Sequence, residues 1–190
     1  HIMKTYASFG VRRFILCLGY KREAFVDYFM NYHMRTADAT ITLGHNPDIR
    51  FYGDCAEADW EVTLAGTGLA TMTGGRGFRA SKYLASDDEN FFLTYGDGVS
   101  DIAALYRRHL CGGKLLTISA VHPEARFGEM ILDGDDVRGF EEKPAQVGGY
   151  INGGYMVVNR KFVKKYLADD ASLIFERTPM TQCAKDGQMC

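Results

Sequence analysis

The chain has 190 residues, of which 46% are hydrophobic and 24% are charged, and its formal net charge is −2. This is the composition of an ordinary globular domain, and it lacks the basic balance typical of nucleic-acid-binding proteins. No apolar run approaches the ~18 residues that a membrane-spanning helix requires, and the start HIMKTYASFG lacks the apolar centre of a signal peptide. We therefore expect neither a nucleic-acid partner nor a membrane partner.

The five cysteines are widely spaced and form no CxxC pair, which argues against a zinc site. Thiols without a disulfide framework are typical of a reducing compartment, so we expect a cytoplasmic protein. Cys17 lies in the apolar run FILCLG, and we expect its thiol to lie in the core.

The opening of the chain predicts a helix, a strand and a second helix. Residues 1–9 predict the end of a helix that Gly10 stops, and residues 13–18 (RFILCL) predict a buried strand. Residues 21–35 predict a helix with one apolar, largely aromatic face. We interpret this aromatic face, like Trp60, as core or subunit contact.

Residues 39–65 contain two β-rich pieces, ATITL and EVTLA, separated by a turn-rich stretch. This pattern predicts an insertion or an antiparallel arm. A helix over residues 75–84, a buried strand over 90–96 and a helix over 101–110 follow.

Residues 114–121 (KLLTISAV) are continuously apolar, which predicts a strand of a parallel sheet covered on both faces. Residues 129–144 predict a hairpin with its turn at 133–136. A strand over 150–159 and a short helix over 161–167 complete the pattern. Residues 1–190 thus predict one α/β domain, and both ends look cut.

The run TYGDGVSD places Gly96, Asp97 and Gly98 at the carboxyl end of a buried strand, where open α/β sheets bind ligands. An aspartate there can hold Mg²⁺, which takes oxygen ligands and bridges to substrate phosphates. The alternative is a simple turn, with Asp101 capping the next helix.

The run TMTGGR places Thr71 and two glycines before a helix, with Arg76 beside them. Amides at a helix start favour anions, and a guanidinium binds phosphate oxygens in pairs. The alternative is a helix start loosened by glycine.

A third candidate region is FEEKPAQVGGYINGGY. Pro144 favours an extended backbone at Lys143, whose amine could hold a phosphate as a point charge, and Glu142 could bind sugar hydroxyls. Asn152 and Gly153 interrupt a strand, which suggests that a ligand approaches the backbone there. The alternative is a surface charge cluster with a bulge.

Two further patterns are weaker. In RFGEM, Gly128 could leave room for a sugar ring and Arg126 could contact an anion. The five histidines are scattered, and we interpret each as a surface or packing residue. A NAD-dependent Rossmann enzyme is a distant alternative, because no GxGxxG follows a strand.

In this order and spacing, GYK, TMTGGR, TYGDGVSD, RFG, FEEKP and INGGY resemble the glucose-1-phosphate cytidylyltransferase family, the CDP-glucose branch of the sugar nucleotidyltransferases. The resemblance implies a Rossmann-like three-layer α/β/α fold with a mixed, mostly parallel sheet. It also implies the transfer of a cytidylyl group from CTP to α-D-glucose 1-phosphate, with Mg²⁺, in nucleotide-sugar and O-antigen biosynthesis. A homo-oligomer is expected from the same resemblance.

The resemblance also implies roles for individual residues. It matches Asp97 to a magnesium ligand, and it makes Asp97, Lys143 and Arg76 the catalytic candidates. The nucleotide contacts would come from Thr71, Arg76 and Gly96, and the sugar-phosphate contacts from Gly128, Glu142, Lys143, Asn152 and Gly153.

Family members also have a GGxGTR loop, a PKP segment and a second magnesium aspartate, none of which occurs in these 190 residues. We therefore expect this chain alone to be inactive. The alternatives are a uridylyl- or thymidylyltransferase acting on the same sugar phosphate and a catalytically dead scaffold subunit.

Overall fold

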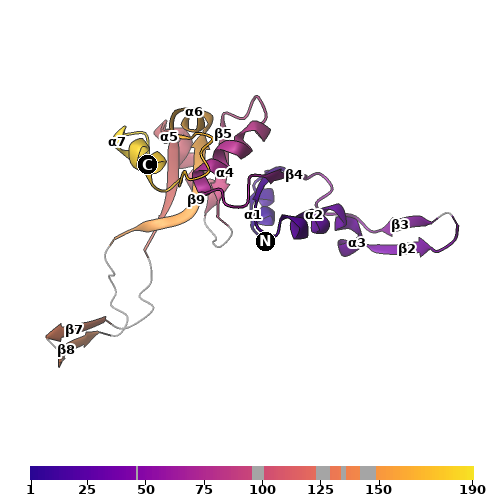
Figure 1. Cartoon of the computed structure of the whole chain (residues 1–190), viewed down its shortest axis with the longest axis horizontal. Coiled ribbons are helices and arrows are strands. Elements are labelled where there is room, and N and C mark those ends of the chain that lie inside the picture. The colour runs from indigo at the N-terminus through magenta and orange to yellow at the C-terminus, as the bar shows by residue number, and fades with distance from the viewer. Residues whose placement is uncertain (46, 96–100, 123–128, 134–135, 142–148) are drawn as a thin grey trace.

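The computed structural model describes residues 1–45, 47–95, 101–122, 129–133, 136–141 and 149–190. The central sheet and its covering helices lie in one part of the molecule, and a helical segment with a hairpin extends from the other part (Figure 1).

The chain begins with helix α1 (Ile2–Ser8), followed by strand β1 (Arg13–Leu18), as predicted. Gly10, with a φ of 87°, turns the backbone between them. Strand β4 (Glu61–Gly66) pairs with β1 in parallel. Their carboxyl ends therefore meet at one edge, where the amide of Thr67 donates to the carbonyl of Leu18 at 3.0 Å.

The segment between β1 and β4 forms an arm, which confirms part of the insertion predicted over 39–65, but EVTLA lies in β4 and pairs with β1 instead of joining the arm. It contains α2 (Arg22–Met30), α3 (Tyr32–Thr36) and the antiparallel strands β2 (Asp38–Thr42) and β3 (Asp48–Tyr52). The single helix predicted over 21–35 is interrupted at Asn31, and the stretch predicted as turn-rich contains β3.

The interpretation of the aromatic helix face as core is wrong. Neither α2 nor α3 has a buried residue, and Phe25 and Tyr28 are 47% and 43% exposed, so subunit contact stays a prediction. Trp60, in contrast, packs against Phe14 with ring centroids 5.0 Å apart, at the edge of a core cluster.

The central sheet has the order β5–β9–β6, with β9 (Ile151–Asn159) between β5 (Asn90–Thr94) and β6 (Leu116–Val121). Both pairs are antiparallel, so the parallel neighbour expected for β6 is wrong. Since β5 and β6 both oppose β9, they run in the same direction. Within this sheet each pair is antiparallel, and the parallel pair of the described chain is β1–β4, so the described strands taken together are mixed, as the fold class predicted.

The remaining elements are mostly helices around this sheet. The predicted hairpin forms with Asp133 opposite Asp136. The elements are α4 (Thr73–Ala80), the short 3₁₀ helix η1 (Ser81–Tyr83), α5 (Ile102–Gly112), β7 (Glu129–Asp133), β8 (Asp136–Glu141), α6 (Arg160–Tyr166) and α7 (Thr178–Lys185).

Strand β9 shows why the fold has three layers. Its side chains alternate between the two faces of the sheet. Tyr155 and Val157 pack in one core with residues of α1 and α5, and Met156 and Val158 pack in the other with residues of α6 and α7. All four are at most 2% exposed, so helices cover both faces and the predicted α/β/α arrangement is confirmed.

Two local expectations need correction. Cys17 is exposed, because its place in β1 points it away from the side that buries Phe14 and Leu18. Helix α7 was not predicted, and after it the amide of Cys190 donates to the Leu116 carbonyl at 3.0 Å, which adds a short parallel bridge to β6.

Across the part of the chain that the structure describes, no helix combines the length and apolar character needed to cross a bilayer.

Candidate functional site

The carboxyl end of β5 lies beside the beginning of β9. The amide of Tyr95 donates to the Gly154 carbonyl at 3.2 Å, and the Thr94 hydroxyl donates to the same oxygen at 3.1 Å. On the other side of β9, Ala120 near the carboxyl end of β6 pairs with Asn152. The ends of β5 and β6 thus meet at the sheet edge where α/β folds bind ligands.

Several predicted site residues lie outside the described residues: Gly96, Asp97, Gly128, Glu142 and Lys143. Gly96 directly follows Tyr95 in the sequence. The described end of β5 therefore leads into the predicted metal-binding run.

The glycines of β9 accommodate side chains of this chain itself. A Cβ atom at Gly153 would lie 2.7 Å from the Ser119 hydroxyl oxygen, and one at Gly154 would lie 3.2 Å from the Tyr95 ring. The pairing of β6 with β9 is irregular between Ile118 and Ala120. The bulge alternative is confirmed, and the sugar contacts of Asn152 and Gly153 stay a prediction.

Arg76 and Thr71 lie in contact, as their spacing in TMTGGR suggested. The Arg76 guanidinium donates to the Thr71 carbonyl at 2.7 Å, to the Thr67 hydroxyl at 2.8 Å and to the Leu69 carbonyl at 3.2 Å. It also lies against Gly19, where a Cβ would be 2.6 Å from Nη1. Arg76 therefore shapes the loop over 67–71 and uses three of its five N–H groups to do so.

Three amides at the start of α4 are used within the chain and are not available to an anion, which narrows the anion site predicted for TMTGGR. The amides of Gly74 and Gly75 donate to the Leu173 carbonyl at 2.9 and 3.2 Å, and the amide of Met72 donates to the Ala171 carbonyl at 2.8 Å. A side chain at Gly75 would collide with the Asp170 carbonyl. The glycine pair lets the segment over 168–177, which we call the strap, lie close against α4.

Glu176 of the strap connects two of the candidate motifs. Its carboxylate accepts a hydrogen bond from the Thr73 hydroxyl at 2.8 Å and another from the Tyr95 hydroxyl. The Thr73 oxygen accepts in turn from the Phe175 amide at 2.9 Å. The strap thereby joins the start of α4 to the end of β5.

Sequence reasoning missed Glu176. It lies about 80 residues after Tyr95 in a segment without a recognisable motif. The short apolar run LIF over 173–175 was the local sign that the strap packs against the domain.

His109 is a packing histidine, as predicted. It is 3% exposed, and its ring nitrogens lie 2.9 Å from the Thr117 hydroxyl and 2.9 Å from the Asn90 side-chain oxygen. Asn90 can only accept at that atom, so Nε2 carries the hydrogen and Nδ1 accepts from Thr117. Burial lowers the pKa of His109, which favours this neutral form.

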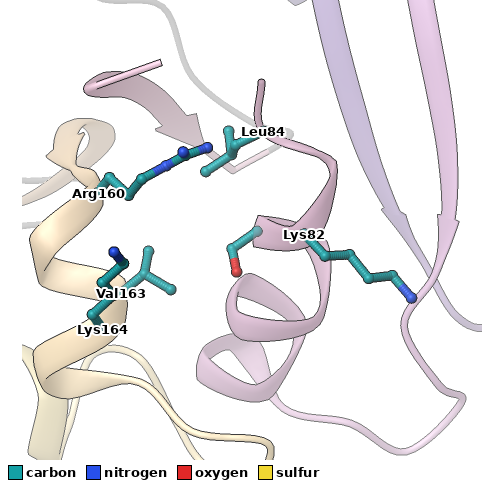
Figure 2. Close-up of a pocket in the computed structure, with 6 residues that line it drawn as sticks. Lys82, Leu84, Arg160, Val163 and Lys164 are labelled. Atoms are coloured by element: carbon teal, nitrogen blue, oxygen red, sulfur yellow. The ribbon is translucent and has the colours of Figure 1, made fainter. Parts of the chain in front are cut away.

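A pocket between η1 and α6 contains none of the candidate residues (Figure 2). Arg160 lines it, but its guanidinium donates to the carbonyls of Ala85 at 2.6 Å and Ser86 at 3.2 Å. The Lys82 side chain extends away from the other lining residues. The cationic groups of this pocket are thus poorly placed to share one ligand.

A second pocket lies between α1, α3 and the base of the arm. There Lys4 and Glu57 form an ion pair at 3.0 Å, and burial, with a hydrogen bond to Glu57, raises the pKa of Tyr32 to about 12. This pocket also lies outside the candidate motifs. Among the described residues, no cluster of three or more His, Cys, Asp or Glu side chains could hold a metal.

The chain is 39% identical to the glucose-1-phosphate cytidylyltransferase of Salmonella typhi over 191 residues, which cover 100% of this chain and 72% of that protein. It is 35% identical, with the same coverage, to the probable glucose-1-phosphate cytidylyltransferase of Bacillus subtilis (strain 168). A search against models of protein families gives no match.

Among solved structures, the chain is similar to HddC from Yersinia pseudotuberculosis, with a TM-score of 0.52 and 23% identity. The similarity covers 92% of this chain and 67% of that one. HddC complexed with GMP-PN matches with a TM-score of 0.53. At this identity the similarity supports the fold alone.

Proposed function

This chain belongs to the glucose-1-phosphate cytidylyltransferase family, and we propose that it serves the transfer of a cytidylyl group from CTP to α-D-glucose 1-phosphate. A phosphate oxygen of the sugar attacks the α-phosphorus of CTP. The bond from that phosphorus to the β-phosphate bridging oxygen breaks, and pyrophosphate leaves. The products are CDP-glucose and pyrophosphate.

The attacking oxygen is already anionic, so the reaction requires no general base. Catalysis then depends on positioning the two phosphates and neutralising their charge. We assign Arg76 and Lys143 to the phosphates, Thr71 and Gly96 to the nucleotide, and Gly128, Glu142, Asn152 and Gly153 to the sugar side.

We further propose that Asp97 holds Mg²⁺. Mg²⁺ at phosphate sites commonly uses one or two carboxylates together with phosphate oxygens. One aspartate beside two phosphorylated substrates fits that donor set, and no cluster of three ligands is needed. When bound, the ion would supply positive charge to the phosphate oxygens.

The observation that carries the proposal is the pair of hydrogen bonds to Glu176. They join Thr73 of the nucleotide motif to Tyr95, which precedes Gly96 and Asp97. Tyr95 also pairs with Gly154 of the sugar motif. Thr73, Tyr95 and Gly154, one described residue from each of the three motifs, thus lie close together, which supports group transfer between two substrates at this edge of the sheet.

The assembly and location of the protein are part of the same proposal. The exposed aromatic face of α2 and α3 supports a homo-oligomer, because an apolar face of this kind is typical of a subunit contact. The five free thiols support the reducing cytoplasm. Supply of CDP-glucose to O-antigen biosynthesis is the expected role in the cell.

A nucleotide panel tests the proposal. The full protein, assayed with glucose 1-phosphate and Mg²⁺, is expected to prefer CTP over UTP and dTTP by about tenfold or more in kcat/KM. The variant Asp97→Asn is expected to lose about 100-fold or more in kcat, because it weakens the metal site.

The matched control is Asp87→Asn, which changes an exposed aspartate outside the site and is expected to retain wild-type turnover. Preference for UTP or dTTP would contradict the base assignment. Absence of turnover with every nucleotide would favour the scaffold subunit.

A further inference from the structure

We propose that Arg79 is a positioning residue for the nucleotide: it fixes the Thr71 hydroxyl as a hydrogen-bond donor toward an acceptor atom of the bound nucleotide. This inference rests on the proposed function, which places the nucleotide against the loop over 67–71. It adds a residue that the sequence motifs did not single out.

Arg79 reaches from α4 to both ends of that loop. Its Nη1 donates to the Thr67 carbonyl at 2.9 Å and to the Thr71 hydroxyl oxygen at 2.8 Å. Its Nε donates to the Asp169 carboxylate of the strap at 2.6 Å. The forked guanidinium group of Arg79 is thus held between the loop and the strap.

The chemistry of these groups sets the direction of the Thr71 hydroxyl. A guanidinium only donates hydrogen bonds, so the Thr71 oxygen has to accept from Arg79. The single hydroxyl hydrogen remains to be donated elsewhere. Thr71 is 6% exposed, and no acceptor for this hydrogen is found among the described side chains and backbone groups.

Thr67 provides an internal comparison. Its hydroxyl also accepts from a guanidinium, that of Arg76 at 2.8 Å, but its own hydrogen is donated to the Leu18 carbonyl at 3.0 Å. Both hydrogen-bonding roles of Thr67 are therefore used within the fold. The Thr71 hydroxyl also accepts from a guanidinium, but its hydrogen remains available for donation to a ligand.

The backbone at Gly68 leaves space for the contact between Arg79 and Thr71. Gly68, with a φ of 105°, lies where a side chain would collide with the Thr71 hydroxyl and approach Arg79 Nη1 to 2.9 Å. The Arg79 and Asp169 side chains are partly exposed, and ion pairs of this kind contribute little to stability. The ion pair between Arg79 and Asp169 is therefore better suited to orienting the Arg79 guanidinium than to stabilising the fold.

The test is a double-mutant cycle on CTP binding, measured by titration calorimetry on the full protein with Mg²⁺. Arg79→Lys keeps the charge but cannot form the fork, and Thr71→Val removes the hydroxyl. Each is expected to raise the Kd for CTP about tenfold, the loss of one ordinary hydrogen bond. In the Thr71→Val background, Arg79→Lys is expected to add less than a twofold effect.

Two further readouts separate positioning from folding. The KM for glucose 1-phosphate and the melting temperature of Arg79→Lys are expected to stay near wild type. Asp169→Asn, which releases the fork from the strap, is expected to weaken CTP binding in the same direction. Arg35→Lys is the matched control, since Arg35 pairs with Asp27 in the arm at 2.5 Å and leaves the loop untouched.

Repeating the cycle with cytidine monophosphate and with tripolyphosphate identifies which part of the nucleotide carries the acceptor. Additive effects of the two substitutions, or an unchanged Kd in Arg79→Lys, would overturn the inference while the wild type still prefers CTP. If the wild type prefers UTP or dTTP, the base assignment fails. The double-mutant cycle is then measured with the preferred nucleotide, and the same outcomes support or overturn the role of Arg79. If the wild type binds no nucleotide, both the proposed function and the role of Arg79 are wrong.

Discussion

Two helices of this chain carry aromatic residues and have opposite surroundings. In α6, Phe162 is fully buried and lies 5.3 Å from the ring of Phe175. In α2, Phe25 is 47% exposed and Tyr28 is 43% exposed. An aromatic stripe thus identifies an apolar face, but the neighbouring elements decide whether the same subunit covers it.

The difference follows from where each helix lies relative to the sheet. Helix α6 follows β9 directly and packs on the face that presents Met156 and Val158. Helix α2 belongs to the arm, which extends away from the central sheet (Figure 1). We therefore expect equal substitutions in the two regions to have very different effects.

The largest effect is expected from Phe162→Ala. Removing a fully buried ring leaves a cavity as well as losing the transfer free energy of the ring, which together cost about 3–5 kcal/mol. Urea unfolding measures this loss in the free energy of unfolding. A loss below about 1 kcal/mol would show that the core around α6 is loosely packed and would break the comparison.

An intermediate effect is expected from the histidines of the two regions. His109 is buried at the sheet, and burial lowers its pKa below the usual value of about 6.5, whereas His33 in α3 is exposed. The unfolded chain takes up the proton at about pH 6.5, and the folded protein takes it up only at lower pH. The free energy of unfolding therefore falls as the pH drops below about 6.5 and levels off below the folded pKa.

Unfolding experiments at pH 7.5 and 5.5 check this sign. His109→Gln is expected to lose less stability on acidification than the wild type, by up to about 1.4 kcal/mol per pH unit of the shifted interval. His33→Gln is the matched control and is expected to follow the wild type. Equal losses in all three proteins would show that the fold does not lower the pKa of His109.

Most of the central fold could be predicted because its strands are largely apolar runs of strand length. In β1, β6 and β9 the short run length and the neighbouring glycines favour a strand over a helix. The pairing could not be predicted, since the same runs fit a parallel or an antiparallel neighbour. Strand β3 was missed because its alternation of charged and apolar residues lies between turn signals.

The sequence predicted which residues belong to the candidate site better than it predicted what those residues contact. The motifs identified Thr71 and Arg76, which do lie together. The amides of the two glycines in TMTGGR, however, donate hydrogen bonds to the carbonyl of Leu173, about 100 residues later in the chain. A local pattern shows that backbone must come close at Gly74 and Gly75, but it does not show whether a phosphate or the protein itself approaches.

The smallest effect on the fold is expected from Phe25→Ala in the arm. Its ring is not buried against the described chain, so the free energy of unfolding of the separated subunit should change by no more than about 0.5 kcal/mol. If α2 is a subunit contact, association stabilises the wild type by mass action, and its unfolding midpoint rises with protein concentration. That rise should shrink in Phe25→Ala while the midpoint at the lowest concentration stays unchanged. A loss of several kcal/mol at every concentration would instead mean that α2 is covered within its own subunit, and the contrast with α6 would disappear.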